Sequence, residues 1–195
     1  MSDPLLNRPV VDAAARLPRS FYVRRTVEVA RDLLGKVIRH GSASAKIVET
    51  EAYLGTDDAA AHSARGMTPR TRVIFGPPGH AYVYLIYGMH YCLNIVAEPE
   101  GVAGCVLIRA VEPTNDMAGT ALPSDGPGKL TRALGITLKH YGVDLTRGPI
   151  TLHDPPDREI FEIGISPRIG ISQAAELPLR FYIRGNRFVS REPRR

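Results

Sequence analysis

A run of aromatic and β-branched residues from Ala81 to Val96 constrains the fold more than any other part of the chain. Such residues favour strands, and the run is interrupted once, at Tyr87-Gly88-Met89. The pattern predicts a β-hairpin with its tip near Gly88. The alternative is one buried run with a bulge at Gly88. Only the hairpin would leave Tyr87 at a tip, where a tyrosine has little to pack against.

A second strand is predicted from Ala45 to Leu54, and it carries two carboxylates. On a regular strand the period of two places Glu49, Glu51 and Tyr53 on one face and Lys46 on the other. The strand ends in the polar turn Gly-Thr-Asp-Asp. Carboxylates that share a face with an aromatic ring at such a strand end predict a reaction centre.

A third strand, Gly104 to Val111, contains Arg109 among apolar residues. An unpaired buried charge is costly, so this arginine must reach solvent or meet an anion. The sequence offers Glu49, Glu51 or a bound phosphate as that anion. A purely structural ion pair is the alternative interpretation, and it does not exclude a functional role.

Short helices are predicted around these strands. Thr26 to Gly35 has helical apolar spacing, and a helix over Asp57 to Ser63 would hold His62 near the carboxylate strand. Gly126 to Gly135 has a proline near its first turn, and its amides and Lys129 could receive a phosphate. The spacing around Lys129 lacks the GxxxxGK[ST] pattern of nucleotide hydrolases.

The connection that follows His62 is basic, since it contains Arg65, Arg70 and Arg72. The segment from Asn115 to Gly126 is predicted to be a loop. After Gly142, strands are expected in the apolar stretches that prolines and glycines separate. Two of these stretches are Ile169 to Ile171 and Phe181 to Arg184.

The 195-residue length predicts a single domain, residues 20–195, after a partly ordered arm at 1–19. No segment resembles a membrane span or a signal core, so a cytoplasmic protein is expected. Cys92 and Cys105 sit in apolar runs without CxxC or histidine neighbours. That context favours packing over a zinc site, and no metal is expected.

Arginine dominates the basic residues, 21 against four lysines, and the net charge is +5. Its planar fork suits phosphate oxygens and so favours nucleic acid as a partner. A GC-rich genome would give the same bias. The last sixteen residues hold six arginines, starting with Arg180, against one glutamate, which is typical of a solvated basic tail.

Seven segments together resemble the alkyladenine (3-methyladenine) DNA glycosylase family, in order, over about residues 20 to 190. They are Glu49-Thr50-Glu51-Ala52-Tyr53-Leu54-Gly55, Ala61-His62-Ser63, Tyr82-Val83-Tyr84-Leu85-Ile86-Tyr87-Gly88-Met89, Leu93-Asn94, Leu107-Ile108-Arg109-Ala110-Val111-Glu112-Pro113, Gly126-Pro127-Gly128-Lys129-Leu130 and Arg180-Phe181-Tyr182-Ile183-Arg184-Gly185. The sequence differs from the pattern at His90-Tyr91 and in the length of the loop between Asn94 and Arg109.

The resemblance implies an α+β fold, which is a single mixed domain around a curved, largely antiparallel sheet with a protruding hairpin and short peripheral helices. It also implies excision of alkylated or deaminated purines, of the 3-methyladenine, 7-methylguanine or hypoxanthine type, from double-stranded DNA. The implied enzyme is a cytoplasmic monomer that acts at the nucleoid and uses no cofactor and no metal.

The resemblance also assigns roles to residues. It implies Glu51 as the base that activates water and Arg109 as its partner, which also contacts the DNA backbone. The other implied positions are pocket walls at Tyr53, His62 and Tyr84, a pocket floor at Asn94, a wedge in the duplex at Tyr87, and backbone contacts at Lys129, Arg70 and Arg72.

The chemistry supports these roles, because a stacked purine must be extruded before its sugar can be attacked. A lyase would need an amine nucleophile, and Lys46 is predicted to point away from Glu51, so a monofunctional enzyme is expected. Two alternatives are a non-catalytic nucleic-acid-binding module, which gives Glu51 no task, and a small-molecule hydrolase using Glu51 and His62.

Overall fold

Strand β2 (Ala43–Tyr53) is the central strand of the sheet that the computed structural model contains. The structure describes residues 15–114, 123–157 and 159–190. One edge of β2 pairs with β5 (Gly104–Pro113), and the other edge is shared by β1 (Val37–His40) and β8 (Arg180–Ile183). Three neighbours on one strand bring residues from distant parts of the chain next to the two carboxylates.

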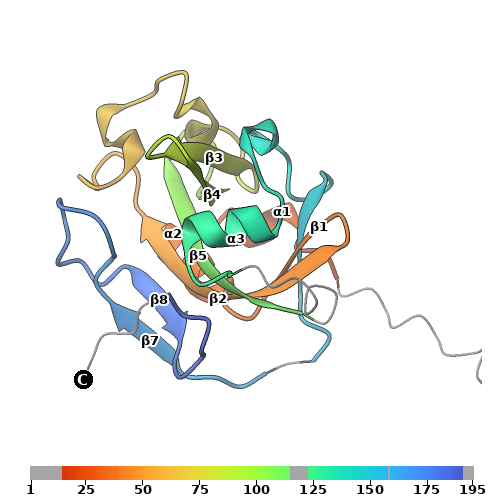
Figure 1. Cartoon of the computed structure of the whole chain (residues 1–195). Helices are drawn as coiled ribbons and strands as arrows, with labels where there is room; N and C mark the ends of the chain where they lie inside the picture. Colours follow the sequence, from red (N-terminus) through yellow and green to blue (C-terminus); the bar gives the residue numbers. More distant parts are fainter. Residues whose placement is uncertain (1–14, 115–122, 158, 191–195) are drawn as a thin grey trace, which may run out of the picture.

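The sheet has eight strands, and all its pairings are antiparallel. Its order is β3-β4-β5-β2-β1-β6, and β8 joins β2 to β7. The other strands are β3 (Ala81–Ile86), β4 (His90–Ala97), β6 (Ile150–His153) and β7 (Ile163–Ser166). Figure 1 shows the sheet curling, with the β7–β8 pair at one end. This confirms the predicted α+β class with a curved antiparallel sheet.

Short helices surround the sheet, as predicted. Helix α2 (Thr26–Asp32) packs on β2 and β5, and α3 (Pro127–Ala133) packs on β4 and β5. In Figure 1 α3 lies in front of the strands. The remaining helices are α1 (Arg19–Tyr22), η1 (His62–Arg65), η2 (Arg72–Phe75) and η3 (Leu138–His140). Among the described helices, none is long and apolar enough to cross a bilayer.

The hairpin prediction for Ala81 to Val96 is confirmed, and the bulged-run alternative is wrong. Strands β3 and β4 pair from Ala81↔Ile95 to Ile86↔His90, and the chain reverses between them. Tyr87 (φ 52°) and Gly88 (φ 70°) both adopt the left-handed conformation, which suits the twist of a tight hairpin turn. Tyr87 is 83% exposed.

Two local predictions are wrong. Asp57 to Ser63 is not a helix, because the Asp58 carboxylate accepts the N–H groups of Leu54 and Ala60 and fixes a turn instead. Only the short η1 follows it. Ile169 to Ile171 is a loop and not a strand, because the Ile169 N–H donates to the Glu51 carboxylate rather than to a neighbouring strand.

The predicted N-terminal arm falls partly outside the described residues, which begin at residue 15. The Leu17 N–H donates to the Leu152 carbonyl at 2.8 Å, so this end of the chain packs on β6. The division at residue 19 stays a prediction. The loop expected from Asn115 to Gly126 lies mostly outside the described residues.

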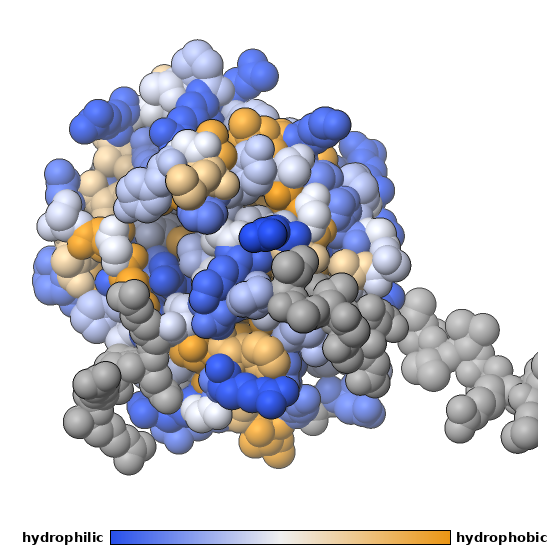
Figure 2. All heavy atoms as spheres, viewed as in Figure 1, coloured by the Kyte–Doolittle hydropathy of each residue, from blue (hydrophilic) through white to orange (hydrophobic). Residues whose placement is uncertain are grey.

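Figure 2 shows separate apolar patches among hydrophilic side chains on the viewed face.

Candidate active site

Glu51 is fully buried and holds three hydrogen-bond donors. Its Oε1 accepts the Ile169 N–H at 2.8 Å and lies 3.2 Å from Arg109 Nη1, and its Oε2 accepts the Tyr53 hydroxyl at 3.0 Å. Burial raises the pKa of Glu51, against the lowering effect of Arg109 and the two other donors. The site therefore holds a carboxylate that binds a proton more strongly than an ordinary glutamate.

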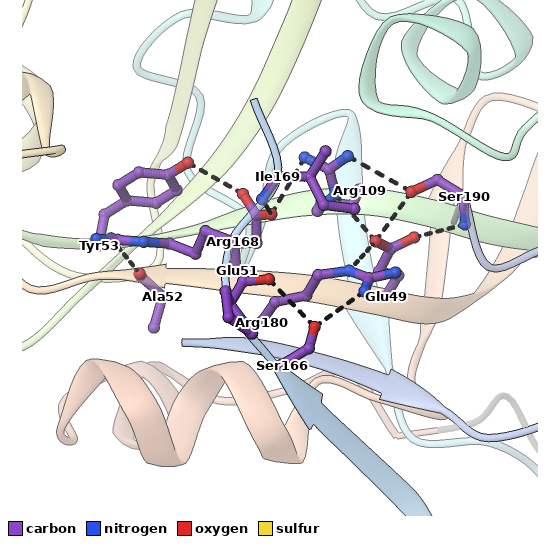
Figure 3. Close-up of polar contacts among 11 residues, drawn as sticks. Glu49, Glu51, Ala52, Tyr53, Arg109, Ser166, Arg168, Ile169, Arg180 and Ser190 are labelled. Atoms are coloured by element: carbon purple, nitrogen blue, oxygen red, sulfur yellow. Dashed lines mark hydrogen bonds and ion pairs between the residues drawn. The ribbon is translucent and has the colours of Figure 1, made fainter. Parts of the chain in front are cut away.

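Glu49 lies beside Glu51 but has different partners (Figure 3). Its Oε1 accepts Arg109 Nε at 3.0 Å, Arg180 Nε at 2.6 Å and the Ser190 hydroxyl at 2.9 Å, and its Oε2 accepts the Ser190 N–H at 2.7 Å. Arg109 thus contacts both carboxylates. Of the anions that the sequence offered for it, both Glu49 and Glu51 are its partners.

The predicted common face of β2 is confirmed for Glu49, Glu51 and Tyr53. They share the Arg109 network, whereas the Thr50 hydroxyl donates to the Ala30 carbonyl of α2. The strand is not regular, because its register with β5 shifts on both sides of Glu49. Residue 48 of β2 and residue 109 of β5 fall outside the pairing there, and such irregularities re-aim side chains.

A cavity of about 310 Å³ lies over these residues, a size at the lower end of small-molecule pockets, roughly 300–1,000 Å³. The four pocket residues expected from the sequence line it, namely Tyr53, His62, Tyr84 and Asn94. Tyr87 and Arg109, which were expected in other roles, line it as well. Cys92 and Cys105 line it as well, and both are buried free thiols. Glu51 does not line the cavity, but its three donors do.

One wall is aromatic. The His62 ring meets the Tyr84 ring edge-on, with 4.6 Å between centroids, and its Nδ1 is 2.8 Å from the Tyr82 hydroxyl. Partial burial and the nearby Arg70 lower the pKa of His62, which favours the neutral imidazole at pH 7. A neutral wall can stack on a cationic ring without repelling it.

Asn94 also lines the cavity, and it is the pairing partner of Tyr82 in the β3–β4 hairpin. Its side chain is buried, and its Nδ2 donates to the Tyr82 carbonyl at 3.2 Å. The Cys105 thiol contacts Asn94 Oδ1 at 4.0 Å. An amide fixed in this way can present only one hydrogen-bonding pattern to a ligand.

Sequence reasoning missed Arg168 and Arg180 as parts of the site. The Arg168 guanidinium lies 4.6 Å from the centre of the Tyr53 ring, donates to the Ala52 carbonyl at 3.0 Å, and forms a fully buried ion pair with Asp58. Arg180 was predicted to begin a solvated basic tail, which is wrong because it is 1% exposed and paired with Glu49. The argument used for Arg109 applies equally to Arg180, since both lie inside apolar strands.

The predicted DNA-backbone residues lie on the surface. Lys129 pairs with Asp125 at 3.0 Å, Arg70 lies 5.0 Å from the Tyr84 ring centre, and Arg72 is exposed. Their contacts with DNA stay predictions. Within residues 15–114, 123–157 and 159–190, no cluster of three or more His, Cys, Asp or Glu side chains could hold a metal ion.

The sequence matches a family model and many curated proteins. The model, described as methylpurine-DNA glycosylase (MPG), matches residues 20–187. A protein of Methanoculleus marisnigri, provisionally named a 3-methyladenine DNA glycosylase, is 49% identical over 190 residues, which is 90% of this chain and 98% of its own length. Proteins with the same name from Rhodopseudomonas palustris (50% over 186 residues) and Legionella pneumophila (46% over 183 residues) each match 90% of this chain, and 91% and 98% of their own lengths.

Proposed function

Because the chain belongs to the methylpurine-DNA glycosylase family and is a DNA repair hydrolase of N-glycosidic bonds, we propose how it acts. It flips an alkylated or deaminated purine, of the 3-methyladenine, 7-methylguanine or hypoxanthine type, out of duplex DNA and into the cavity. Glu51 then activates the water that attacks the sugar. The observation that carries the proposal is a buried carboxylate whose three donors all line that cavity.

The hydrogen-bond pattern leaves a place for the water. A carboxylate offers about four lone-pair positions, and in the described residues the Ile169 N–H and the Arg109 ion pair lie at Glu51 Oε1, while the Tyr53 hydroxyl alone lies at Oε2. The free position on Oε2 accepts the proton of the attacking water, while the water oxygen bonds to C1′. The glycosidic bond breaks and its electron pair leaves with the purine, which an already cationic 3-methyladenine accepts readily.

The cavity walls suit such a cation. The Tyr53 and Tyr84 rings line the cavity, and a cation over an aromatic ring gains roughly 0.5–2 kcal/mol. The neutral His62 adds no repulsion. The negative charge of Glu51 also stabilises an oxocarbenium-like transition state, as carboxylates do in glycoside hydrolysis.

Tyr87 takes the place of the extruded nucleotide in the duplex. Its ring is 83% exposed at the hairpin tip, beside the cavity, and its φ of 52° is unusual for a bulky residue. Strained positions of this kind are kept where function requires them. Stacking of a base on such a ring contributes roughly 1–3 kcal/mol, comparable to the few kcal/mol that unstacking costs.

The product is proposed to be an intact strand with an abasic site. A lyase needs an amine that forms a Schiff base with the sugar. Lys46, on the same strand as Glu51, is ion-paired with Glu112 and Glu159 at 2.8 Å each. Borohydride should therefore trap no covalent complex between protein and DNA, and the appearance of one would refute the monofunctional assignment.

The deciding experiment measures base excision from a duplex with one 3-methyladenine or hypoxanthine, read as alkali-labile strand cleavage. Glu51→Gln should lower single-turnover excision by about 10²–10⁴-fold, the usual contribution of a general base. Glu162→Gln, which changes an exposed carboxylate that precedes β7 and pairs with Arg184, is the matched control and should excise normally. Full activity of Glu51→Gln would overturn the assignment.

A non-catalytic nucleic-acid-binding module is not favoured. Such a module gains nothing from a fully buried carboxylate held by three donors in an arginine-rich protein. It predicts equal or tighter DNA binding by Glu51→Gln with no turnover to lose, so the same variant separates the two functions.

A further inference from the structure

Glu49 is as deeply buried as Glu51 and holds more donors, yet the reaction described above gives it no step. Its four hydrogen bonds come from Arg109 on β5, Arg180 on β8, and the N–H and hydroxyl of Ser190. These partners follow Glu49 by 60 to 141 positions in the chain. Glu49 therefore joins three distant segments at one point.

That point also controls how Arg109 is oriented. The guanidinium is planar, so fixing two of its nitrogens fixes the whole group. Its Nε donates to Glu49 at 3.0 Å, while its Nη1 lies 3.2 Å from Glu51. Without the contact to Glu49, the Arg109 fork keeps on that side only the longer hydrogen bond from Nη2 to the Ser190 hydroxyl, at 3.4 Å, and the contact to Glu51 loses part of its fixed geometry.

Charge is balanced at the same place. Arg180 is the ladder partner of Glu51 in the pairing of β2 with β8, and its Nε donates to Glu49 at 2.6 Å. The two carboxylates thus face two buried guanidinium groups. The titratable and charged groups around Glu51 are Glu49 and Tyr53 from β2 itself, Cys92 from β4, Arg109 from β5, Arg180 from β8, and Arg168 from the loop between β7 and β8.

We propose that Glu49 is a positioning residue of the excision reaction: it orients Arg109 against Glu51 and offsets the charges of Arg109 and Arg180, so that Glu51 stays basic enough to activate water. The proposal rests on the proposed role of Glu51. A purely structural Glu49 would tie the strands together without affecting how strongly Glu51 holds a proton.

The electrostatics agree with this role. Burial raises the pKa of Glu51, Arg109 lowers it, and the negative charge of Glu49 raises it again. A carboxylate with a lower pKa is a weaker base and removes the proton of water less effectively. Losing the charge of Glu49 should therefore slow excision and move the acid limb of the pH profile downward.

The first test is Glu49→Gln, which keeps the shape and removes the charge. Single-turnover excision should fall by about 10-fold or more at pH 7, the dissociation constant for lesion DNA should change little, and the acid limb should move about one pH unit lower. Glu49→Asp keeps the charge and should hold the limb at its wild-type position.

Arg180→Met provides the opposite test. Without this buried positive charge, the negative charge of Glu49 is less compensated and raises the pKa of Glu51 further. The acid limb of the pH profile should therefore move to higher pH. In the double variant Glu49→Gln/Arg180→Met the local charge is the same as in the wild type, so the limb should return. The rate should stay low, because Arg109 is still not oriented. Replacing both members of a buried pair is often tolerated, so this variant also protects the test against misfolding.

Each variant is assayed at a temperature at which circular dichroism shows it folded. A limb that stays in place in both single variants, or that moves in the same direction in both, overturns the proposal. A failure of the underlying mechanism looks different, because Glu51→Gln would then keep excising. Loss of activity in Glu51→Gln together with wild-type rates and pH profile in Glu49→Gln rejects this inference alone.

Discussion

Tyr53 combines three contacts in one side chain. Its hydroxyl donates to Glu51 at 3.0 Å, its ring lines the cavity, and the Arg168 guanidinium lies 4.6 Å from the ring centre. Because Arg168 is itself buried against Asp58, the ring has little freedom to turn. The residue can therefore stack on a purine and support the carboxylate at the same time.

Tyr53→Phe keeps the ring and removes only the hydroxyl. This hydrogen bond lowers the pKa of Glu51, so its loss should raise that pKa further and shift the acid limb of excision to higher pH. Activity should recover at alkaline pH, where Glu51 is ionised again. The measurement is a pH series of single-turnover rates.

Tyr84→Phe is the control for this variant, because Tyr84 lines the same cavity and its hydroxyl interacts with Cys92. Its acid limb should match that of the wild type. If Tyr53→Phe also keeps the wild-type limb, the hydroxyl does not support the carboxylate.

At the scale of an element, the β3–β4 hairpin packs in the core at its inner positions and is exposed at its tip. Its inner positions pack in the core, as Val83 and Leu93 do, while Tyr87 and Met89 at the tip are 83% and 70% exposed. The chain thus carries a bulky aromatic residue at a point where it contributes little to folding. The hairpin thus presents Tyr87 to solvent at its tip.

Tyr87→Gly should lower excision from duplex DNA by about 10-fold or more, since it removes stacking of roughly 1–3 kcal/mol. Excision from single-stranded DNA should change little, because no gap has to be filled. The melting temperature should stay within a few degrees, because relief of strain of about 1 kcal/mol offsets the added flexibility of the unfolded chain, about 0.4–1 kcal/mol. Equal losses on both substrates would argue against the wedge role.

The hairpin and helix α3 were predictable because their signals are local. A break at Tyr87-Gly88-Met89 inside a strand-forming run, and a proline at the first turn of Pro127–Ala133, each specify structure within a few residues. The prediction of a helix at Asp57 to Ser63 is wrong because the Asp58 side chain accepts backbone N–H groups and fixes a turn instead. The partner of Asp58 lies too far along the chain for a local pattern to reveal it.

At the scale of the whole molecule, a buried ion pair joins two loops of the site that are far apart in the sequence. Asp58 and Arg168 are 110 positions apart, both side chains are fully buried, and their two hydrogen bonds include one of 2.8 Å. Although burial alone would raise it, hydrogen bonds from Arg168 hold the pKa of Asp58 below its usual value. This pairing fixes the turn after β2 against the loop that covers Glu51.

Asp58→Asn should lower the free energy of unfolding by about 3–5 kcal/mol, since it leaves Arg168 buried without its anion. Asp32→Asn removes the partner of an exposed ion pair, with Arg24, and should cost at most about 1 kcal/mol. Urea denaturation measures both. Comparable values for the two would show that the buried pair does not stabilise the fold.

The same pair predicts a pH dependence. A lowered pKa in the folded state means that the contribution of Asp58 is complete above the unfolded value, about 3.9, and is lost as the pH falls through the lower folded value. The difference in stability between the wild type and Asp58→Asn should therefore shrink in acid. Urea denaturation of both proteins between neutral pH and strong acid measures this.

The sequence by itself determined the strands that carry the carboxylates and Arg109, the hairpin tip and the common face of Glu49, Glu51 and Tyr53, because period and turn chemistry act over a few residues. Only the tertiary structure decided which groups surround the carboxylates. The Ile169 N–H, Arg180 and Ser190 reach them from 118 to 141 positions away. Such partners come together only when strands pair and loops fold over the sheet. A local sequence pattern does not reveal contacts between residues so far apart in the chain. The carboxylate that we propose as the base therefore lies on one strand, but the fold around it sets how strongly it binds a proton.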